Sequence, residues 1–332
     1  MVTLTNQLKL YREELPPLIE VKNLTKQYGT HTAISDLNFT VNAGEIVGFL
    51  GPNGAGKTTT MNIMTGFIAA TRGDVAIDGQ DIIAEPEKAK QQIGYMPDTP
   101  PVYGDMRVDE YLGFVADIKK VPRGDRKHML HQIKAQVQIL DVSRRLIKNL
   151  SRGYRQRVGL AQAMVGNPRV IIMDEPTIGL DPKQIIEMRD VVKSLGKKHT
   201  VMLSSHIMQE VSAVCDRVII INRGNIVAQG TPKELSASLT KAEGMNQLRV
   251  KATSEAARAA LKDFTVIRHV EISASDEPGT VDLQLAGESG ADIREAIFRA
   301  FAKHNLPILS MRSMDLSLEE VFLKLTGDRR TS

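Results

Sequence analysis

A glycine-rich stretch near the start of the chain has the residue types and spacing of a phosphate-binding loop. It reads GPNGAGKTT and directly follows the apolar run EIVGFL. Its glycines let backbone N–H groups turn inward around an anion, and the helix expected after it adds the positive end of its dipole. Lys57 supplies a mobile charge for the outer phosphates, and the Thr58 hydroxyl is a ligand for Mg²⁺. The residues expected to bind nucleotide here are Gly51, Asn53, Gly54, Gly56, Lys57, Thr58 and Thr59.

Two acids follow a second apolar run further along the chain. Asp174 and Glu175 come directly after VIIM, which is predicted as a buried strand. Parallel sheets bind ligands at the carboxyl ends of their strands. There Asp174 can hold Mg²⁺, directly or through water, and Glu175 can take a proton from an attacking water. Together with the phosphate loop, the pair indicates hydrolysis of a nucleoside triphosphate.

The elements that must position these residues alternate between strand and helix. Alternation of this kind predicts a parallel sheet with right-handed crossovers. Between the two motifs, residues of about 86–165 have apolar side chains at helical spacing, and we predict a mostly helical insertion there. The predicted strands are 18–21, 39–41, 45–50, 170–173, 201–204 and 218–221, and the predicted helices are 57–65, 111–118, 127–140, 183–195 and 207–214.

Beyond Thr231-Pro232 the pattern changes to β-α-β-β-α-β, the ferredoxin-like order. A last helix is predicted to begin at Ser317, with Glu320 at capping-box spacing. We therefore expect an N-terminal leader at 1–17, a nucleotide-binding domain at 18–232 and a C-terminal α+β domain at 233–332. The last domain could serve dimerisation or regulation, or be a passive packing lobe. Its predicted elements are strands 247–251, 264–270, 280–285 and 307–312 and helices 254–263 and 291–304.

Composition limits where and on what the chain acts. A net charge of +4 over 332 residues suits an anionic ligand or a lipid surface, and no basic run accompanies it, so no nucleic acid is expected. No apolar run approaches the roughly 18 residues of a membrane helix, and no export signal is visible. The single cysteine, Cys215, fits a reducing compartment. His128 and His131 have a spacing that could hold a metal, but with no third ligand nearby a solvated helix face is favoured.

Six features, in order along about residues 18–232, resemble the nucleotide-binding domain of ABC ATPases. GPNGAGKT and IIMDEP match the two Walker motifs of that family, and LSRGYRQR resembles its signature. Gly179-Leu180-Asp181 resembles the D-loop, Ser205-His206 the switch histidine, and Tyr28 the aromatic residue that stacks on adenine. The resemblance implies an α/β P-loop ABC ATPase domain, with a mixed sheet and a helical subdomain, that binds ATP and Mg²⁺ and hydrolyses ATP.

Two positions depart from the commonest family pattern. In the signature, which usually reads LSGGQ, Arg152 replaces a glycine and Tyr154 replaces the glutamine. Ser151 and Gly153, the positions expected to touch phosphate, are retained. Asp98, in IGYMPD, stands where the family most often has glutamine. A carboxylate there could bind Mg²⁺ but would position water differently.

The resemblance also implies a mechanism that needs two copies of the chain. Ser151 and Gly153 of one copy would close over ATP held by the phosphate loop of the other. Glu175 would act as general base, His206 would contact the γ-phosphate and orient that base, and Asp181 would lie at the junction of the copies. The expected partners are therefore a second copy and integral membrane transporter subunits, with the chain peripheral on the cytoplasmic face of the cell membrane.

The segments LSRGYRQRVGLAQA and SLEEVFLKLTG resemble one branch of the family. Its members are ATPase subunits of exporters linked to gliding motility, nitrous-oxide reductase maturation and drug efflux. The leading hypothesis is therefore the energy-coupling subunit of an exporter. An ATP-switched mechanical or regulatory module on a membrane complex has the same chemistry and stays open. A soluble ABC protein of translation or DNA repair fits less well, since those usually carry two such domains or long coiled coils.

Overall fold

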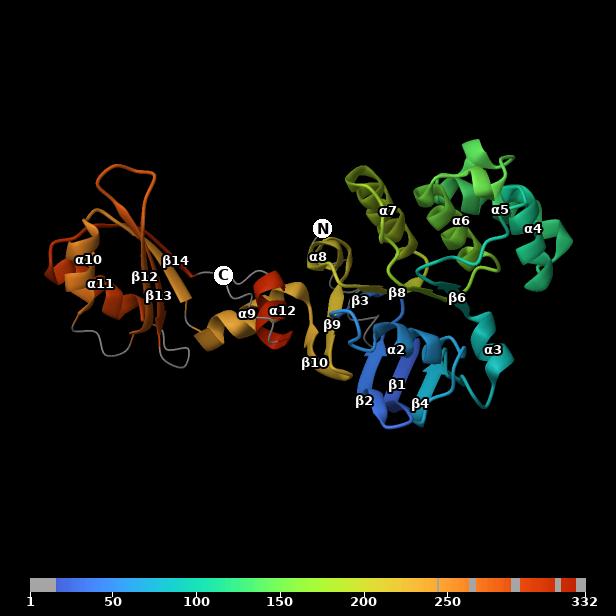
Figure 1. Cartoon of the computed structure of the whole chain (residues 1–332), viewed down its shortest axis with the longest axis horizontal. Helices are drawn as coiled ribbons and strands as arrows, with labels where there is room; N and C mark the ends of the chain where they lie inside the picture. Colours follow the sequence, from blue (N-terminus) through green and yellow to red (C-terminus); the bar gives the residue numbers. More distant parts are fainter. Residues whose placement is uncertain (1–15, 244, 263–266, 288–292, 314–317, 327–332) are drawn as a thin grey trace. The chain divides into compact units, whose positions relative to one another are not determined.

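The computed structural model describes residues 16–243, 245–262, 267–287, 293–313 and 318–326. The chain divides into two compact units, Met1–Thr231 and Pro232–Ser332 (Figure 1), and each is described by itself. No helix within the described ranges is long and apolar enough to span a bilayer.

A six-stranded sheet in the order β10-β9-β3-β8-β7-β6 forms the centre of the first unit. All neighbouring strands are parallel except β9 and β10, which confirms the expected mixed sheet. The strands are nearly continuous apolar runs, as expected of a sheet covered on both faces. Their bounds are β3 (Ile46–Leu50), β6 (Ile93–Met96), β7 (Val170–Met173), β8 (Thr200–Ser205), β9 (Arg217–Asn222) and β10 (Asn225–Gly230).

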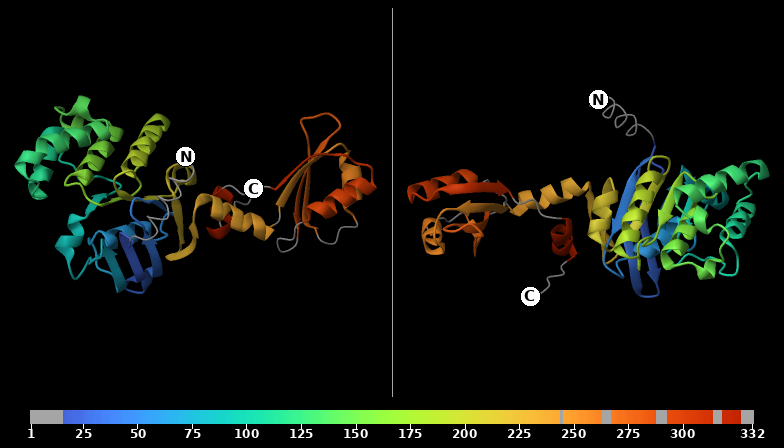
Figure 2. Two further views of the ribbon diagram at one scale, coloured as in Figure 1. Left: turned by 180° about the vertical axis from the view of Figure 1, so that it is seen from behind. Right: turned by 90° about the horizontal axis from the view of Figure 1, so that it is seen from above.

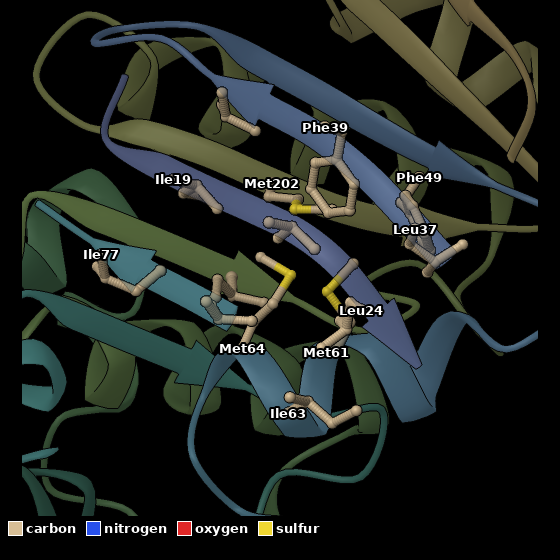
Figure 3. Close-up of a cluster of buried hydrophobic side chains, with 14 of the residues drawn as sticks. Ile19, Leu24, Leu37, Phe39, Phe49, Met61, Ile63, Met64, Ile77 and Met202 are labelled. Atoms are coloured by element: carbon tan, nitrogen blue, oxygen red, sulfur yellow. The ribbon is translucent and has the colours of Figure 1, made fainter. Parts of the chain in front are cut away.

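A second, antiparallel sheet in the order β2-β1-β4-β5 shares a core with the central sheet. Met61 and Met64 on helix α2 lie in this core beside Ile19 and Ile77 of the antiparallel sheet (Figure 3). The strand bounds are β1 (Ile19–Tyr28), β2 (His31–Val41), β4 (Arg72–Ile77) and β5 (Gln80–Asp81). The buried core therefore holds α2, and with it the end of the phosphate loop, firmly against both sheets.

Helices complete the first unit. Helices α4, α5 and α6 contact one another, and α6 also packs on β6 at the edge of the central sheet (Figures 1 and 2). Helix α8 packs on the central sheet so closely that a Cβ at Gly48 would lie 2.3 Å from Val211 Cγ1. The helices are α2 (Lys57–Met64), α3 (Pro86–Gln91), α4 (Val108–Ile118), α5 (Arg123–Gln136), α6 (Arg152–Met164), α7 (Pro182–Leu195) and α8 (Met208–Val214), with short 3₁₀ turns at Leu140–Val142 and Ile147–Asn149.

Residues of about 86–165 are mostly helical, as predicted, but they include one strand that was not predicted and that matters for the site. Strand β6 lies inside that range and forms the edge of the central sheet, paired in parallel with β7. Its four residues are too few for any period to separate strand from helix. Strands β4, β5 and β10 and helix α3 were also not predicted, and β1 and β2 are longer than expected because polar residues interrupt their apolar pattern.

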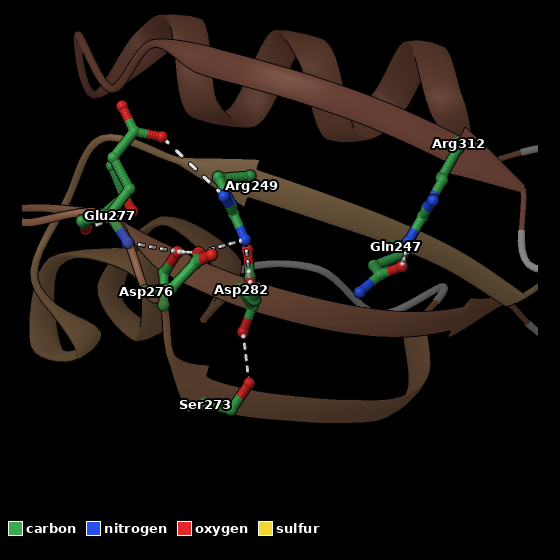
Figure 4. A network of polar contacts seen from close by, with 9 residues as sticks. Gln247, Arg249, Ser273, Asp276, Glu277, Asp282 and Arg312 are labelled. Atoms are coloured by element: carbon green, nitrogen blue, oxygen red, sulfur yellow. Dashed lines mark hydrogen bonds and ion pairs between the residues drawn. The ribbon is translucent and has the colours of Figure 1, made fainter.

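The second unit contains a four-stranded antiparallel sheet in the order β12-β13-β11-β14. This order and the sequence β-α-β-β-α-β confirm the ferredoxin-like prediction. Helices α10 and α11 cover its apolar face, while Arg249 pairs with Asp276 and Asp282 on the polar side (Figure 4). The elements are α9 (Pro232–Glu243), β11 (Met245–Val250), α10 (Ser254–Leu261), β12 (Ile267–Ala274), β13 (Val281–Gly287), α11 (Arg294–Lys303), β14 (Ile308–Ser313) and α12 (Leu318–Thr326). The expected cap Ser317 lies outside the described residues, as does most of the leader.

Candidate nucleotide-binding site

The phosphate loop leaves the end of β3 and turns into α2. Gly54 and Gly56 have φ values of 79° and 107°, which glycine adopts at little cost. A Cβ at Gly56 would lie 2.5 Å from Ile34 Cγ2 and 2.9 Å from the Ala33 carbonyl oxygen, so no larger residue fits. Lys57 is the first residue of α2, and its buried Nζ donates to the Gly51 carbonyl oxygen at 2.7 Å. The loop therefore curls around its own lysine, in the form that binds phosphate at a helix N-terminus.

Glu175 lies between a lysine and a histidine. Its Oε1 is 3.4 Å from Lys57 Nζ, and its Oε2 is 2.9 Å from His206 Nδ1. Its φ of 48° is in the left-handed region, and its backbone N–H donates to Ser204 Oγ at 3.0 Å. The structure thus brings together three of the predicted site residues from three separate segments, and it holds both oxygens of the predicted base in place.

Asp174 and Thr58 form the second polar group of the site. Asp174 is buried, and burial raises the pKa of its carboxyl, against hydrogen bonds from Ser204 and Thr58 that lower it. A buried carboxylate beside a threonine hydroxyl suits a hard cation whose other ligands are phosphate oxygens and water. The described residues contain no cluster of three acids, histidines or cysteines that could hold a metal alone. The pair therefore fits the Mg²⁺ of a Mg²⁺–nucleotide complex.

Asp98 follows the unpredicted strand β6, beside the strand that ends in Asp174. Its carboxylate accepts a hydrogen bond from the Thr99 backbone N–H at 2.7 Å, and its carbonyl oxygen accepts one from Gln156 Nε2 at 2.9 Å. Among the described residues, no hydrogen bond joins it to Thr58 or Asp174. Its expected roles as catalytic residue and metal ligand stay predictions.

The signature residues lie at the start of α6. Ser151 is the N-cap of this helix and accepts a bond from the Tyr154 N–H at 3.4 Å. The Tyr154 hydroxyl donates a hydrogen bond to the Asp141 carboxylate at 2.9 Å. Gly153 is buried against Gln184, whose Oε1 would lie 2.7 Å from a Cβ at that position.

Asp181 caps the neighbouring helix α7 by accepting from the Gln184 N–H at 2.9 Å. Within the described parts of the chain, no hydrogen bond or ion pair links Ser151, Gly153 or Asp181 to the group around Glu175. The predicted site residues therefore form two separate groups.

Tyr28 ends β1 and is 50% exposed, with Lys26 Nζ 5.0 Å from its ring centroid. An exposed aromatic face suits a nucleotide base, and the cation on it adds a favourable contact. The hairpin that carries it continues into β2, whose Ala33 and Ile34 touch the phosphate loop.

Two polar residues that position the site were not predicted. Ser204 donates to Asp174 and accepts from the Glu175 N–H, so it joins the two acids. Glu210 is buried and accepts hydrogen bonds from Thr177 and Ser205. For Ser204 the available signal was the change from apolar to polar residues at the end of β8, and that change does not identify a hydrogen-bond partner. Glu210 lies on α8, where no such signal was present in the sequence.

Comparison with known proteins shows the family to which this chain belongs. Residues 34–178 match the ABC transporter family model. The chain is 33% identical over 323 residues to the uncharacterized ABC transporter ATP-binding protein YhcH of Bacillus subtilis, covering 94% of this chain and 97% of YhcH. This chain belongs to the family of ABC transporter ATP-binding proteins.

Two further similarities bear on the proposals below. The linearmycin resistance ATP-binding protein LnrL of Bacillus subtilis is 29% identical over 311 residues, covering 93% of this chain and 98% of LnrL. The dimeric structure of the bacterial ABC transporter cassette MJ0796 has a TM-score of 0.59 at 24% identity and covers 64% of this chain and 98% of that one. At that identity the second similarity supports the fold alone.

Proposed function

We propose that the chain hydrolyses ATP in a homodimer and thereby drives export through separately encoded membrane subunits. The observation that carries the proposal is the Glu175 carboxylate, held between Lys57 and His206 beside the phosphate loop. This arrangement combines a charge for phosphate, a base for water and a residue that orients the base. Phosphoryl transfer needs little more than these and a metal.

In this mechanism Lys57 exchanges its contact with Glu175 for the outer phosphates of ATP. The freed Oε1 of Glu175 then accepts a proton from water, while His206 holds Oε2 and fixes the direction of the carboxylate. Thr58 and Asp174 would hold Mg²⁺, and the ion would supply positive charge to balance that which develops on the phosphates. Tyr28 stacks on adenine, which contributes about 1–3 kcal/mol by analogy with stacking on single-stranded bases.

A second copy supplies the remaining contacts. Ser151 and Gly153 present the N-terminus of α6, an anion-binding element, but they form a group apart from Glu175 in their own chain. Pairing two chains brings this helix terminus of one copy to the phosphates held by the other. The cassette MJ0796, which has a similar fold, was solved as a dimer.

A groove beside the site suits the membrane subunit. It has a volume of about 550 Å³ and is lined by Asn62, Phe67, Tyr95 and Pro97, among others. Phe67 is 77% exposed there. Asn62 lies on the helix that begins with Lys57, and Pro97 precedes Asp98. We propose that an apolar cytoplasmic segment of the membrane subunit binds in this groove, because it would then touch elements at both ends of the nucleotide site.

Export rather than import is proposed from the relative LnrL, whose name assigns it to resistance against linearmycin. Removal of a toxic compound from the cell is one way in which an ATP-binding protein confers resistance. A toxic compound is therefore the class of substrate to test first.

The test is reconstitution of the full chain with its membrane subunits in proteoliposomes. We expect ATP-dependent substrate movement, and we expect Phe67→Ser to uncouple it while basal ATP hydrolysis remains. Ile83→Ser, at an apolar residue that is 63% exposed outside the groove, is the matched control and should change neither. ATP hydrolysis without movement of any candidate substrate would instead favour an ATP-switched mechanical or regulatory module.

A further inference from the structure

A small pocket lies between the segment after β6 and the start of α6. Its volume is about 290 Å³, and its lining includes Asp98, Arg152, Arg155 and Gln156. The two residues that depart from the usual family pattern with a change of charge, Asp98 and Arg152, therefore share one cavity. They are 54 positions apart in the sequence.

Arg152 is the pocket's available cation. A Cβ at Gly179 would lie 2.4 Å from Arg152 Cζ, so the guanidinium rests over the backbone of the loop before α7. Among the described residues it has no hydrogen-bond or ion-pair partner. The other arginine of the pocket, Arg155, is already engaged, because its Nη1 donates to the Leu150 carbonyl oxygen at 2.6 Å.

Two hydrogen-bond acceptors in the pocket, the Asp98 carboxylate and Gln156 Oε1, receive fewer hydrogen bonds from the part of the chain that the structure describes than they can accept. The Asp98 carboxylate receives only the Thr99 N–H among the described residues. Gln156 is 2% exposed, and its Nε2 holds the Asp98 carbonyl oxygen, but its Oε1 has no partner. A buried amide oxygen without a donor is unfavourable, since burial removes the water that would otherwise bind it. Gln156 lies four residues after Arg152 on α6, so both side chains project from the same face of that helix.

We propose that Arg152 is a positioning residue that leaves Gly179 and pairs with the Asp98 carboxylate across this pocket when nucleotide is bound. A guanidinium has five N–H donors in a fixed fork and can therefore serve Asp98 and Gln156 Oε1 together.

Pairing Asp98 with Arg152 reduces the negative charge near the nucleotide site. Asp98 lies near Asp174, whose carboxyl pKa its charge helps to raise. Each negative charge at this end of the sheet opposes the binding of a triphosphate, and Arg152 cancels that of Asp98. Because Arg152 belongs to the signature helix, the pair also ties that helix to the residue beside the nucleotide. This inference rests on the proposed ATP-binding function of the site.

The test is a double-mutant cycle of Asp98→Asn, Arg152→Ala and both together in the full chain. Mg²⁺–ATP affinity and the kcat and KM of hydrolysis are measured for each variant. Arg152→Ala leaves a carboxylate unpaired, so we expect nucleotide affinity to fall about tenfold, and Asp98→Asn in that background should recover most of it. The Arg152→Ala defect should shrink as salt is raised from about 50 to about 500 mM, because salt screens the exposed charge. Arg152→Lys, which keeps the charge, should restore at least half of the lost affinity.

Arg144→Ala is the matched control. Arg144 is exposed and outside the pocket, and its side chain has no partner among the described residues. Its effect should be small and additive with Asp98→Asn. If the effects of Asp98→Asn and Arg152→Ala on Mg²⁺–ATP affinity are additive within twofold, the two side chains do not interact and the proposal is wrong.

A defect of Asp98→Asn that excess Mg²⁺ relieves in either background would instead assign Asp98 to the metal. Absence of ATP hydrolysis in the parent protein would contradict the proposed function. The double-mutant cycle on Mg²⁺–ATP affinity would still show whether Asp98 and Arg152 interact.

Discussion

At the scale of single residues, the Glu175 side chain is held by a contact to each of its two carboxylate oxygens. Lys57 and His206 contact different oxygens of Glu175, while the backbone of Glu175 has a φ of 48° and donates to Ser204. A non-glycine residue in the left-handed region costs of order 1–3 kcal/mol and persists only where its surroundings hold it. The contacts with Lys57, His206 and Ser204 therefore hold Glu175 in a backbone conformation that is unfavourable for a residue with a side chain.

Replacement of Glu175 by glutamine tests the role of base. The amide keeps the size and an acceptor for His206 but cannot take a proton, so kcat should fall by about 10²–10⁴. Nucleotide affinity should stay within about threefold, and a dimer should accumulate with Mg²⁺–ATP. Phosphate release and light scattering measure these outcomes. Glu85→Gln, at an exposed acid paired with Lys88, is the control. Parental hydrolysis by the Glu175 variant would assign the base elsewhere.

Asp174 gives a prediction of pH dependence. Burial raises the pKa of its carboxyl, so the folded chain holds a proton that the unfolded chain releases, and stability falls as pH rises through this interval. Asp174→Asn should therefore raise the Tm of the nucleotide-free protein by a few degrees at pH 7–8. The difference should shrink as pH falls through the raised pKa of the Asp174 carboxyl, because the parent side chain then becomes neutral like asparagine.

Thermal unfolding between pH 4 and 8 measures this, and Asp282→Asn is a control of opposite sign. The Asp282 carboxyl pKa is lowered by its hydrogen bond with Arg249, so that variant should lose stability at neutral pH. The Asp174→Asn variant should also gain less stability from Mg²⁺–ATP than the parent protein does. A loss of stability on Asp174→Asn at pH 7 would contradict the account.

At the scale of elements, the contact between β6 and α6 matters most. A Cβ at Gly94 would lie 2.2 Å from the Ala163 carbonyl oxygen, so the signature helix packs directly on the strand that precedes Asp98. Gln156 strengthens the connection through the Asp98 carbonyl oxygen. Movement of α6 should therefore move the segment that carries Asp98.

Gly94→Ala tests this packing. The added methyl group meets backbone that cannot give way easily, and we expect a loss of about 1–3 kcal/mol in the free energy of unfolding. Gly113→Ala, in the middle of α4 with nothing within 4 Å of the new Cβ, should instead stabilise by up to about 1 kcal/mol. Urea unfolding of the two variants measures the contrast. Equal effects would show that β6 and α6 are not packed this closely.

At the scale of the whole molecule, the chain has two units with separate cores. Leu24, Phe49 and Met61 belong to the core of the first, and Leu283 and Phe301 to that of the second. A unit with its own core can fold alone. All the predicted nucleotide-binding residues lie in the first unit.

A fragment of residues 1–231 should therefore fold and bind Mg²⁺–ATP with an affinity within about threefold of the full chain, because no ligand residue is lost. Isothermal titration and circular dichroism measure the affinity and the folding. A folded fragment that binds more than tenfold more weakly would mean that the second unit contributes to the nucleotide site. The full chain, measured in the same buffer, is the control.

The sequence by itself predicted the site residues whose arrangement depends on local geometry. A phosphate loop is formed by consecutive residues, so GPNGAGKTT identified it, and an acidic pair after a buried strand needs no distant partner to be recognised. The alternation of strands and helices likewise predicted a parallel sheet, and the order of elements after Pro232 predicted the ferredoxin-like unit. The mixed character of the sheet was implied by the family resemblance.

Only the tertiary structure decided which of these residues meet. It placed Asp98 after an edge strand that was predicted as part of a helical insertion, and it put Asp98 and Arg152 in one pocket. It also showed that Ser204 joins Asp174 and Glu175, and that Glu210 accepts hydrogen bonds from Thr177 and Ser205. Most of these contacts join segments far apart in the chain. They follow from the order of strands in the sheet and the packing of α6 on its edge, which no local pattern encodes.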